Sequence, residues 1–85
     1  MNWEVRLTKE AQKELNRIPA FYQTKIILAF QCLAQDPFSG KKLNGKLSGL
    51  YTYRVWPYRI IYKLYKNQLL IIIIHITHRQ GAYKR

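Results

Sequence analysis

Hydrophobic residues recur with a period of two at the start of the chain and with helical spacing after it. Positions 2–7 alternate between polar and apolar side chains, which predicts a short strand with one buried face. Thr8 can cap a helix, and apolar steps of four and three residues predict that helix from Lys9 to Ile18. Pro19 ends it, because the residue before a proline is disfavoured in the α region.

A second helix is predicted from about Ala20, and Asp36–Pro37 ends it by the same rule. Its apolar side chains form a wide stripe, so the two helices are expected to form a hairpin with one buried face. The stripe consists of Tyr22, Ile26, Ala29, Phe30 and Leu33.

The C-terminal half reads as a cationic connection over residues 38–49 followed by three strands. We expect the strands at residues 50–55, 58–65 and 69–76, joined by short turns into an antiparallel meander. The third is apolar on both faces, which is typical of a central strand. The sequence therefore predicts one α+β domain over residues 1–85. After an N-terminal strand, a two-helix hairpin packs on one face of a small sheet. That sheet is completed by a C-terminal three-strand antiparallel meander.

Charge is distributed very unevenly along this pattern. The net charge is +11, yet no Asp or Glu follows Asp36, and ten of the fifteen Lys and Arg residues do. These cations alternate with tyrosines and Trp56 in the predicted strands. Structured cations beside aromatic side chains favour a surface that binds nucleic acid over a merely solvated face.

Composition narrows the cellular setting. The single Cys32 excludes an internal disulfide, fits a reducing cytoplasm, and is predicted to be a small buried hydrophobe. The N-terminus has no secretory pattern, and the longest apolar run, residues 69–74, is too short to span a bilayer. We expect a cytoplasmic protein that binds no membrane. The few His and Cys residues make a poor metal site, and no cofactor motif is present, so no cofactor is predicted.

Several side chains could support RNA chemistry. Arginines such as Arg54, Arg59 and Arg79 suit phosphate binding, because a guanidinium is always charged and can hold two oxygens at once. His78 lies where the last strand gives way to a polar segment, so it is a candidate for proton transfer. His75 follows four isoleucines, which favours a buried, hydrogen-bonded imidazole. Trp56, before Pro57 in a turn, is interpreted as an edge-packing residue or a partner contact, not as a platform for a nucleobase.

Three motifs in order resemble the RelE/ParE superfamily of bacterial and archaeal toxins. They are Leu43-x-Gly45-x-Leu47-x-Gly49-Leu50-Tyr51-x-Tyr53-Arg54-Val55, then Tyr58-Arg59-Ile60-Ile61-Tyr62, then Ile74-x-Ile76-x-His78-Arg79-x-x-x-Tyr83. The resemblance covers nearly the whole chain. It implies one fold with two activities: RelE-like members cleave messenger RNA in the ribosomal A site, whereas ParE-like members inhibit DNA gyrase and cleave nothing.

The resemblance also implies roles for individual residues. Cations matching Arg54, Arg59 and Arg79 serve the phosphate in RelE-like toxins, and the tyrosine matching Tyr83 stacks on or activates the substrate. Thr52 stands where the best-known RelE pattern has a lysine used in proton transfer, so His78, a lysine of residues 41–46 and Tyr83 all remain candidates for the general base. Further RNA contacts are expected from Lys41, Lys42, Lys46, Lys84 and Arg85.

The first hypothesis is therefore a ribosome-dependent messenger RNA endonuclease that attacks through the 2′-hydroxyl without a metal. The alternative is a ParE-like inhibitor of gyrase. Expected partners are the ribosome with its messenger RNA and an acidic antitoxin, which complements the basic half in a toxin–antitoxin hetero-oligomer.

Overall fold

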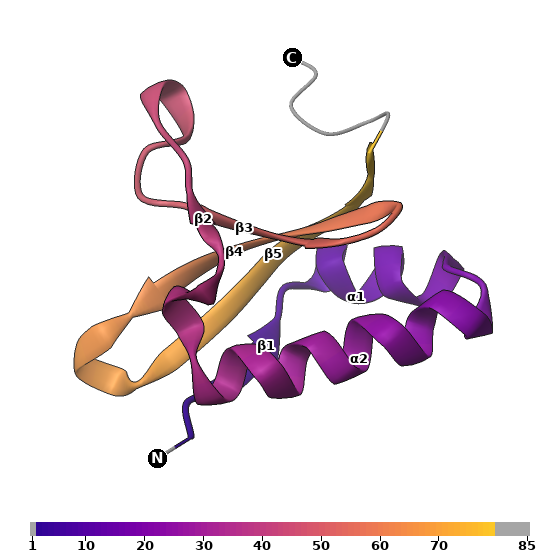
Figure 1. Ribbon diagram of the computed structural model, residues 1–85, viewed down its shortest axis with the longest axis horizontal. Helices are drawn as coiled ribbons and strands as arrows, with labels where there is room; N and C mark the ends of the chain where they lie inside the picture. Colours follow the sequence, from indigo (N-terminus) through magenta and orange to yellow (C-terminus); the bar gives the residue numbers. More distant parts are fainter. Residues whose placement is uncertain (1, 80–85) are drawn as a thin grey trace.

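The computed structural model describes residues 2–79, and within them the predicted α+β fold is confirmed. Strand β1 (Glu4–Leu7) leads into helices α1 (Lys9–Arg17) and α2 (Ala20–Gln35), and the meander consists of β3 (Tyr51–Val55), β4 (Tyr58–Tyr65) and β5 (Leu70–His78). Figure 1 shows both helices on one face of the sheet, with no helix over the opposite face in the described part of the chain. We call that uncovered surface the open face.

Five strands form the sheet, in the order β1-β5-β4-β3-β2. Strand β5 pairs in parallel with β1 and antiparallel with β4, which confirms its predicted interior position. The short strand β2 (Lys41–Lys42) pairs with the start of β3 and was not predicted. The connection is therefore structured, and it also holds the 3₁₀ turns η1 (Pro37–Ser39) and η2 (Gly45–Leu47), while η3 (Lys66–Gln68) joins β4 to β5.

The core lies between the helices and the sheet. Thr8 caps α1 as predicted, since its side chain accepts a hydrogen bond from the Ala11 amide at 3.1 Å. The predicted stripe of α2 is buried at Ile26, Ala29, Phe30 and Leu33. The remaining buried members are Ala11, Leu15 and Ile18 beside α1, Ile60 and Tyr62 of β4, and Ile71, Ile73 and Ile76 of β5.

Cys32 corrects a sequence expectation, because it is exposed. Helix α2 is apolar on its outer side as well as its inner side, with Phe21, Ile27 and Leu28 also exposed. An apolar neighbourhood in the sequence therefore did not distinguish the covered face of this helix from the uncovered one.

Tyr62 ties the connection after α2 to the core. Its side chain is fully buried, and its hydroxyl donates to the Pro37 carbonyl at 2.8 Å and accepts from the Gly40 amide at 3.2 Å. A Cβ at Gly40 would collide with this hydroxyl and lie 2.8 Å from the Thr52 carbonyl oxygen, so glycine is required for the close approach. The backbone is thereby fixed immediately before Lys41.

Burial raises the pKa of Tyr62 from 10.0 to about 12. The folded state favours the neutral phenol, so this stabilisation is complete below pH 10 and is lost as the pH rises toward 12. In an ultraviolet titration of the folded protein, we expect one of the seven tyrosines to ionise late, and Tyr62→Phe to remove that step. Tyr62→Phe should also cost about 1–3 kcal/mol near neutrality, because it leaves a buried amide and carbonyl unpaired. A titration curve that Tyr62→Phe leaves unchanged at high pH would contradict this account.

Candidate functional site

The register of the meander brings two of the predicted arginines together. Arg54 of β3 lies directly opposite Arg59 of β4, and Arg59 lies opposite Thr77 of β5. Residues directly opposite each other in an antiparallel pair share a face. Their neighbours Ile60 and Tyr62 point into the helix-covered core, so Arg54, Arg59 and Thr77 form a row across the open face.

A pocket of about 660 Å³ lies beside this row. Its cationic lining comes from Lys41, Arg54 and Arg59, so β2, β3 and β4 each contribute one positive charge. The rest of the lining is Ser39, Gly40, Leu43, Thr52 and Tyr53. Among residues 2–79, no carboxylate lines the pocket.

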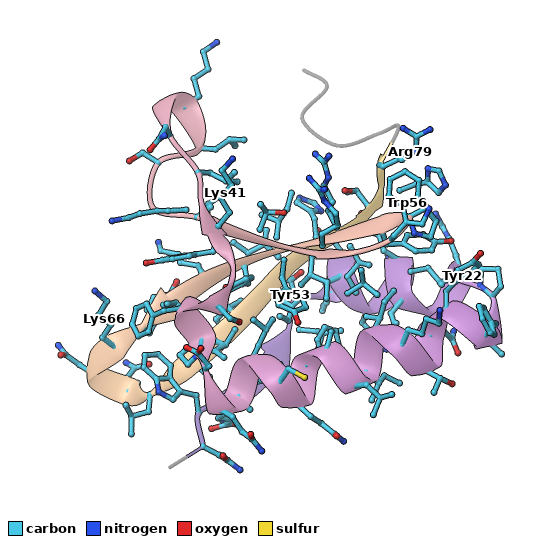
Figure 2. All side chains as sticks on the ribbon, in the orientation of Figure 1. Tyr22, Lys41, Tyr53, Trp56, Lys66 and Arg79 are labelled. Carbon is cyan, nitrogen blue, oxygen red and sulfur yellow. The ribbon has the colours of Figure 1, made fainter. Side chains whose placement is uncertain are left out.

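Arg79 is held at the same end of the sheet, just beyond β5. Its amide donates to the Pro57 carbonyl at 2.8 Å, which fastens the chain to the turn between β3 and β4. Its guanidinium carbon lies 4.8 Å from the ring centroid of Trp56, a cation–π contact that Figure 2 shows at the end of β5. All three predicted phosphate-binding arginines therefore lie near the β3–β4 turn.

His78 is not brought to the open face. It lies opposite Tyr58, and its ring meets the Tyr58 ring edge-on at 5.4 Å between centroids. Tyr58 in turn packs against Tyr22 of α2, with ring centroids 5.5 Å apart. The register thus places His78 on the helix-covered side of the sheet, opposite to the face of Arg54 and Arg59.

The expectation of a buried His75 is wrong. Its side chain is 46% exposed, and its Nδ1 lies 3.4 Å from a carboxylate oxygen of Glu14. Strand β1 ends at Leu7, so α1 runs beside the rest of the β5 edge, and Glu14 accepts the Ile76 amide at 2.8 Å. Glu14 therefore accepts a hydrogen bond from the Ile76 amide, which would otherwise lack a strand partner. The His75 ring lies next to this hydrogen bond.

The structure places the predicted RNA-binding lysines on different surfaces. Lys41 pairs with Thr52 and lines the pocket, whereas Lys42 pairs with Tyr51, whose side chain packs on the core. Lys46 is exposed in η2, and Figure 2 shows Lys41 across the open face from Arg79. The remaining predicted residues, Tyr83, Lys84 and Arg85, lie outside the described residues.

Two threonine hydroxyls lie next to the arginines. Sequence reasoning missed Thr77, and it named Thr52 only as the residue in place of a lysine of the RelE pattern. In the described part of the chain, Oγ1 of Thr52 and Oγ1 of Thr77 are buried without a hydrogen-bond partner. Thr77 precedes Arg79 by two residues, and Thr52 precedes Arg54 by two, so period-two counting from the arginines could have found both. Both threonines therefore share the face of Arg54 and Arg59.

The electrostatics of the row favour an anion. Like charges directly opposite each other on a sheet are destabilising, and the sequence of strands β3, β4 and β5 contains no Asp or Glu. An anionic group between the guanidiniums would offset this repulsion and could accept two parallel hydrogen bonds from each. Within residues 2–79, no three His, Cys, Asp or Glu side chains gather as a metal-binding group. Nor does any helix there have the length and apolar content needed to cross a bilayer.

A helix hairpin on one face of a small mixed sheet, with a basic cluster on the other, defines a class of small basic proteins suited to binding polyanions. Comparison by sequence identifies the family. Residues 5–83 match the family model of the ParE toxin of type II toxin–antitoxin systems, parDE, and the chain belongs to this family. It is a RelE/ParE-like toxin of a type II toxin–antitoxin system.

Individual similar proteins agree with this family assignment. The chain is 29% identical to Toxin RelG of Mycobacterium tuberculosis over 87 residues, which cover 100% of both chains. It is 30% identical to Toxin RelE of the same organism over 84 residues, covering 96% of this chain and 87% of the relative. Among solved structures, the RelBE2 toxin–antitoxin complex of M. tuberculosis matches with a TM-score of 0.87 and 27% identity over 93% of each chain.

Proposed function

We propose that this toxin is a ribosome-dependent endonuclease that cuts messenger RNA by in-line attack of a 2′-hydroxyl on the neighbouring phosphate. The observation that carries the proposal is the row of Arg54 and Arg59 on the open face, joined by Lys41 in one pocket that no carboxylate of the described residues lines. Support also comes from the two mycobacterial relatives that bear RelG and RelE names.

In this mechanism, Arg54 and Arg59 bind the scissile phosphate and stabilise the charge that builds up on the phosphorane. Preorganised cations of this kind stabilise the transition state more than the ground state. Arg79 contributes a third guanidinium from the end of β5. The ribosome orients the messenger, because a chain of 85 residues offers little surface on which to hold the attacking group in line.

Proton transfer is assigned to Lys41 for the departing 5′-oxygen. An ammonium is a compact donor, and Lys41 lines the same pocket as Arg54 and Arg59. Tyr83 stays a prediction from the resemblance, with a role on the substrate base or as the proton acceptor. His78 is the weaker candidate, because the register places it with Tyr58 and not with the arginines.

The second candidate function is inhibition of DNA gyrase without cleavage. The family model favours it, since its description names the ParE toxin. The same basic cluster would then contact gyrase or its DNA.

We also propose that an acidic antitoxin neutralises the toxin by laying an anionic chain across the open face. The net charge of +11 needs an anionic complement when no RNA is bound. The similar RelBE2 structure of M. tuberculosis is a toxin–antitoxin complex, which supports an antitoxin as the partner.

Induction of the protein in a bacterium separates the two functions. Mapping of messenger 5′ ends should reveal new cuts inside translated codons, and the cuts should disappear when translation initiation on a reporter is blocked. Plasmid supercoiling, measured in the same cells, should stay unchanged. Relaxed or broken DNA with intact messengers would overturn the nuclease and favour the gyrase inhibitor, and efficient cutting of naked transcripts would contradict the ribosome dependence.

A further inference from the structure

Trp56 is a large aromatic residue that the fold leaves uncovered. It lies with Pro57 in the turn between β3 and β4, and 62% of its surface is exposed. The guanidinium carbon of Arg79 lies over the ring, 4.8 Å from its centroid. Because a side chain this exposed has only one ring face under the guanidinium, its second face is open to solvent.

The position of this ring relates it to the phosphate cluster. Trp56 follows Arg54 by two residues, and its turn closes the two strands that carry the Arg54–Arg59 pair. The Arg79 amide holds the same turn through the Pro57 carbonyl at 2.8 Å. A guanidinium that stacks through its flat face keeps its N–H donors at the edge, so Arg79 can contact Trp56 and a phosphate together.

We propose that the solvent-exposed side of the Trp56 ring stacks on a nucleobase of single-stranded RNA. One nucleotide is then held by its base on Trp56 and by its phosphate on the neighbouring arginines. The inference rests on the proposed function and adds a base-binding position to it. Aromatic stacking tolerates any base, because every base has a π face. This proposal differs from the sequence interpretation of Trp56 as an edge-packing residue or a partner contact.

Phe21 offers a matched control within the same chain. It is 65% exposed and lies under a cation, with the Lys25 ammonium 4.7 Å from its ring centroid, yet it belongs to α2 in the helix layer. Substitution of Phe21 removes an equally exposed aromatic ring with an equally close cation. Phe21 differs from Trp56 in ring type and in the kind of cation, and above all in its place in the fold, away from the arginine row.

The first measurement is tryptophan fluorescence in a full-length Trp3→Phe background, where Trp56 is the single tryptophan. The probe is a short single-stranded RNA with 2′-O-methyl groups that prevent cleavage, titrated at low salt. We expect quenching of Trp56 on binding. The affinity of each variant is measured by the fluorescence anisotropy of the same RNA carrying a fluorescent label, because Trp56 variants lack the tryptophan signal. Trp56→Ala should weaken binding roughly 5- to 150-fold, the range for loss of one stacked base. Trp56→Phe should retain most of the affinity, and Phe21→Ala should leave it unchanged.

An abasic series tests whether the contact is to a base. With oligonucleotides that lack one base at successive positions, the cost of Trp56→Ala should vanish at one position. A cost that persists at every position would overturn the proposal and leave Trp56 as a positioning residue for Arg79. Binding that depends on Arg54 and Arg59 without quenching of Trp56 would overturn this inference alone, whereas absence of any RNA binding would overturn the proposed function with it. Thermal unfolding of each variant establishes that it is folded.

Discussion

Replacing Arg54 and Arg59 together with alanine is expected to lower messenger cleavage on programmed ribosomes by at least about 10³-fold. Removal of one preorganised donor to a developing negative charge typically costs about 10²–10³ in rate, and here both members of a directly opposed pair are removed. Each single variant should lose about 10²-fold. The loss should fall mainly on kcat, because the guanidiniums act most strongly on the charge of the phosphorane.

The fold should tolerate this double substitution. Arg54 is exposed, and the change removes two like charges that lie opposite each other. The free energy of unfolding, measured by thermal unfolding, is therefore expected to stay within about 1 kcal/mol of the parent. Lys13→Ala combined with Arg17→Ala is the matched control, since it removes two exposed positive charges from α1. If the control reduces cleavage as much as the Arg54 and Arg59 variant, the effect is one of net charge and the proposed site is wrong.

The secondary structure of this chain follows from local signals. The change from period two to helical spacing at Thr8, and the prolines at 19 and 37, fix the beginnings and ends of the first three elements to within about two residues. The run of isoleucines in β5 correctly indicated an interior strand. These features depend on neighbours in the sequence, and this is why a single sequence is enough to predict them.

Local sequence signals could not predict which face of the sheet carries His75 and which carries His78. The register of β4 and β5 shifts between Ile61 and Tyr62, so that Ile61 pairs with His75 and Tyr62 with Ile73, and Ile74 is the extra residue. One inserted residue reverses inside and outside for the rest of the strand. Counting by two from Ile73 would bury His75, whereas the bulge exposes His75 and turns His78 toward Tyr58.

The ordered conformation of the connection after α2 also depends on contacts between residues that are distant in sequence. Its glycines and lysines predict a loop, but the hydroxyl of Tyr62 binds this segment at Pro37 and Gly40, which lie 25 and 22 residues away. Only the folded chain reveals that Gly40 is needed for a close approach. The consequence reaches the candidate site, because Lys41 follows directly and pairs with Thr52 on the open face.

This placement of Lys41 leads to the prediction that distinguishes the candidates for proton transfer. Lys41→Met keeps the length of the side chain and removes its charge, and we expect it to lower cleavage on the ribosome about 10²-fold or more. His78→Gln should cost less than about tenfold, because the imidazole lies on the side of Tyr58 while Lys41 shares a pocket with Arg54 and Arg59. Lys42→Met is the matched control, since its side chain is directed to the opposite face from that of Lys41.

Single-turnover cleavage separates the chemical step from product release, and thermal unfolding verifies that each variant is folded. A loss confined to Lys41→Met supports an ammonium that donates to the departing oxygen from the open face. If His78→Gln instead removes activity as completely as Lys41→Met, the imidazole must reach the phosphate, and assigning the face of each side chain from strand register would fail at the end of β5.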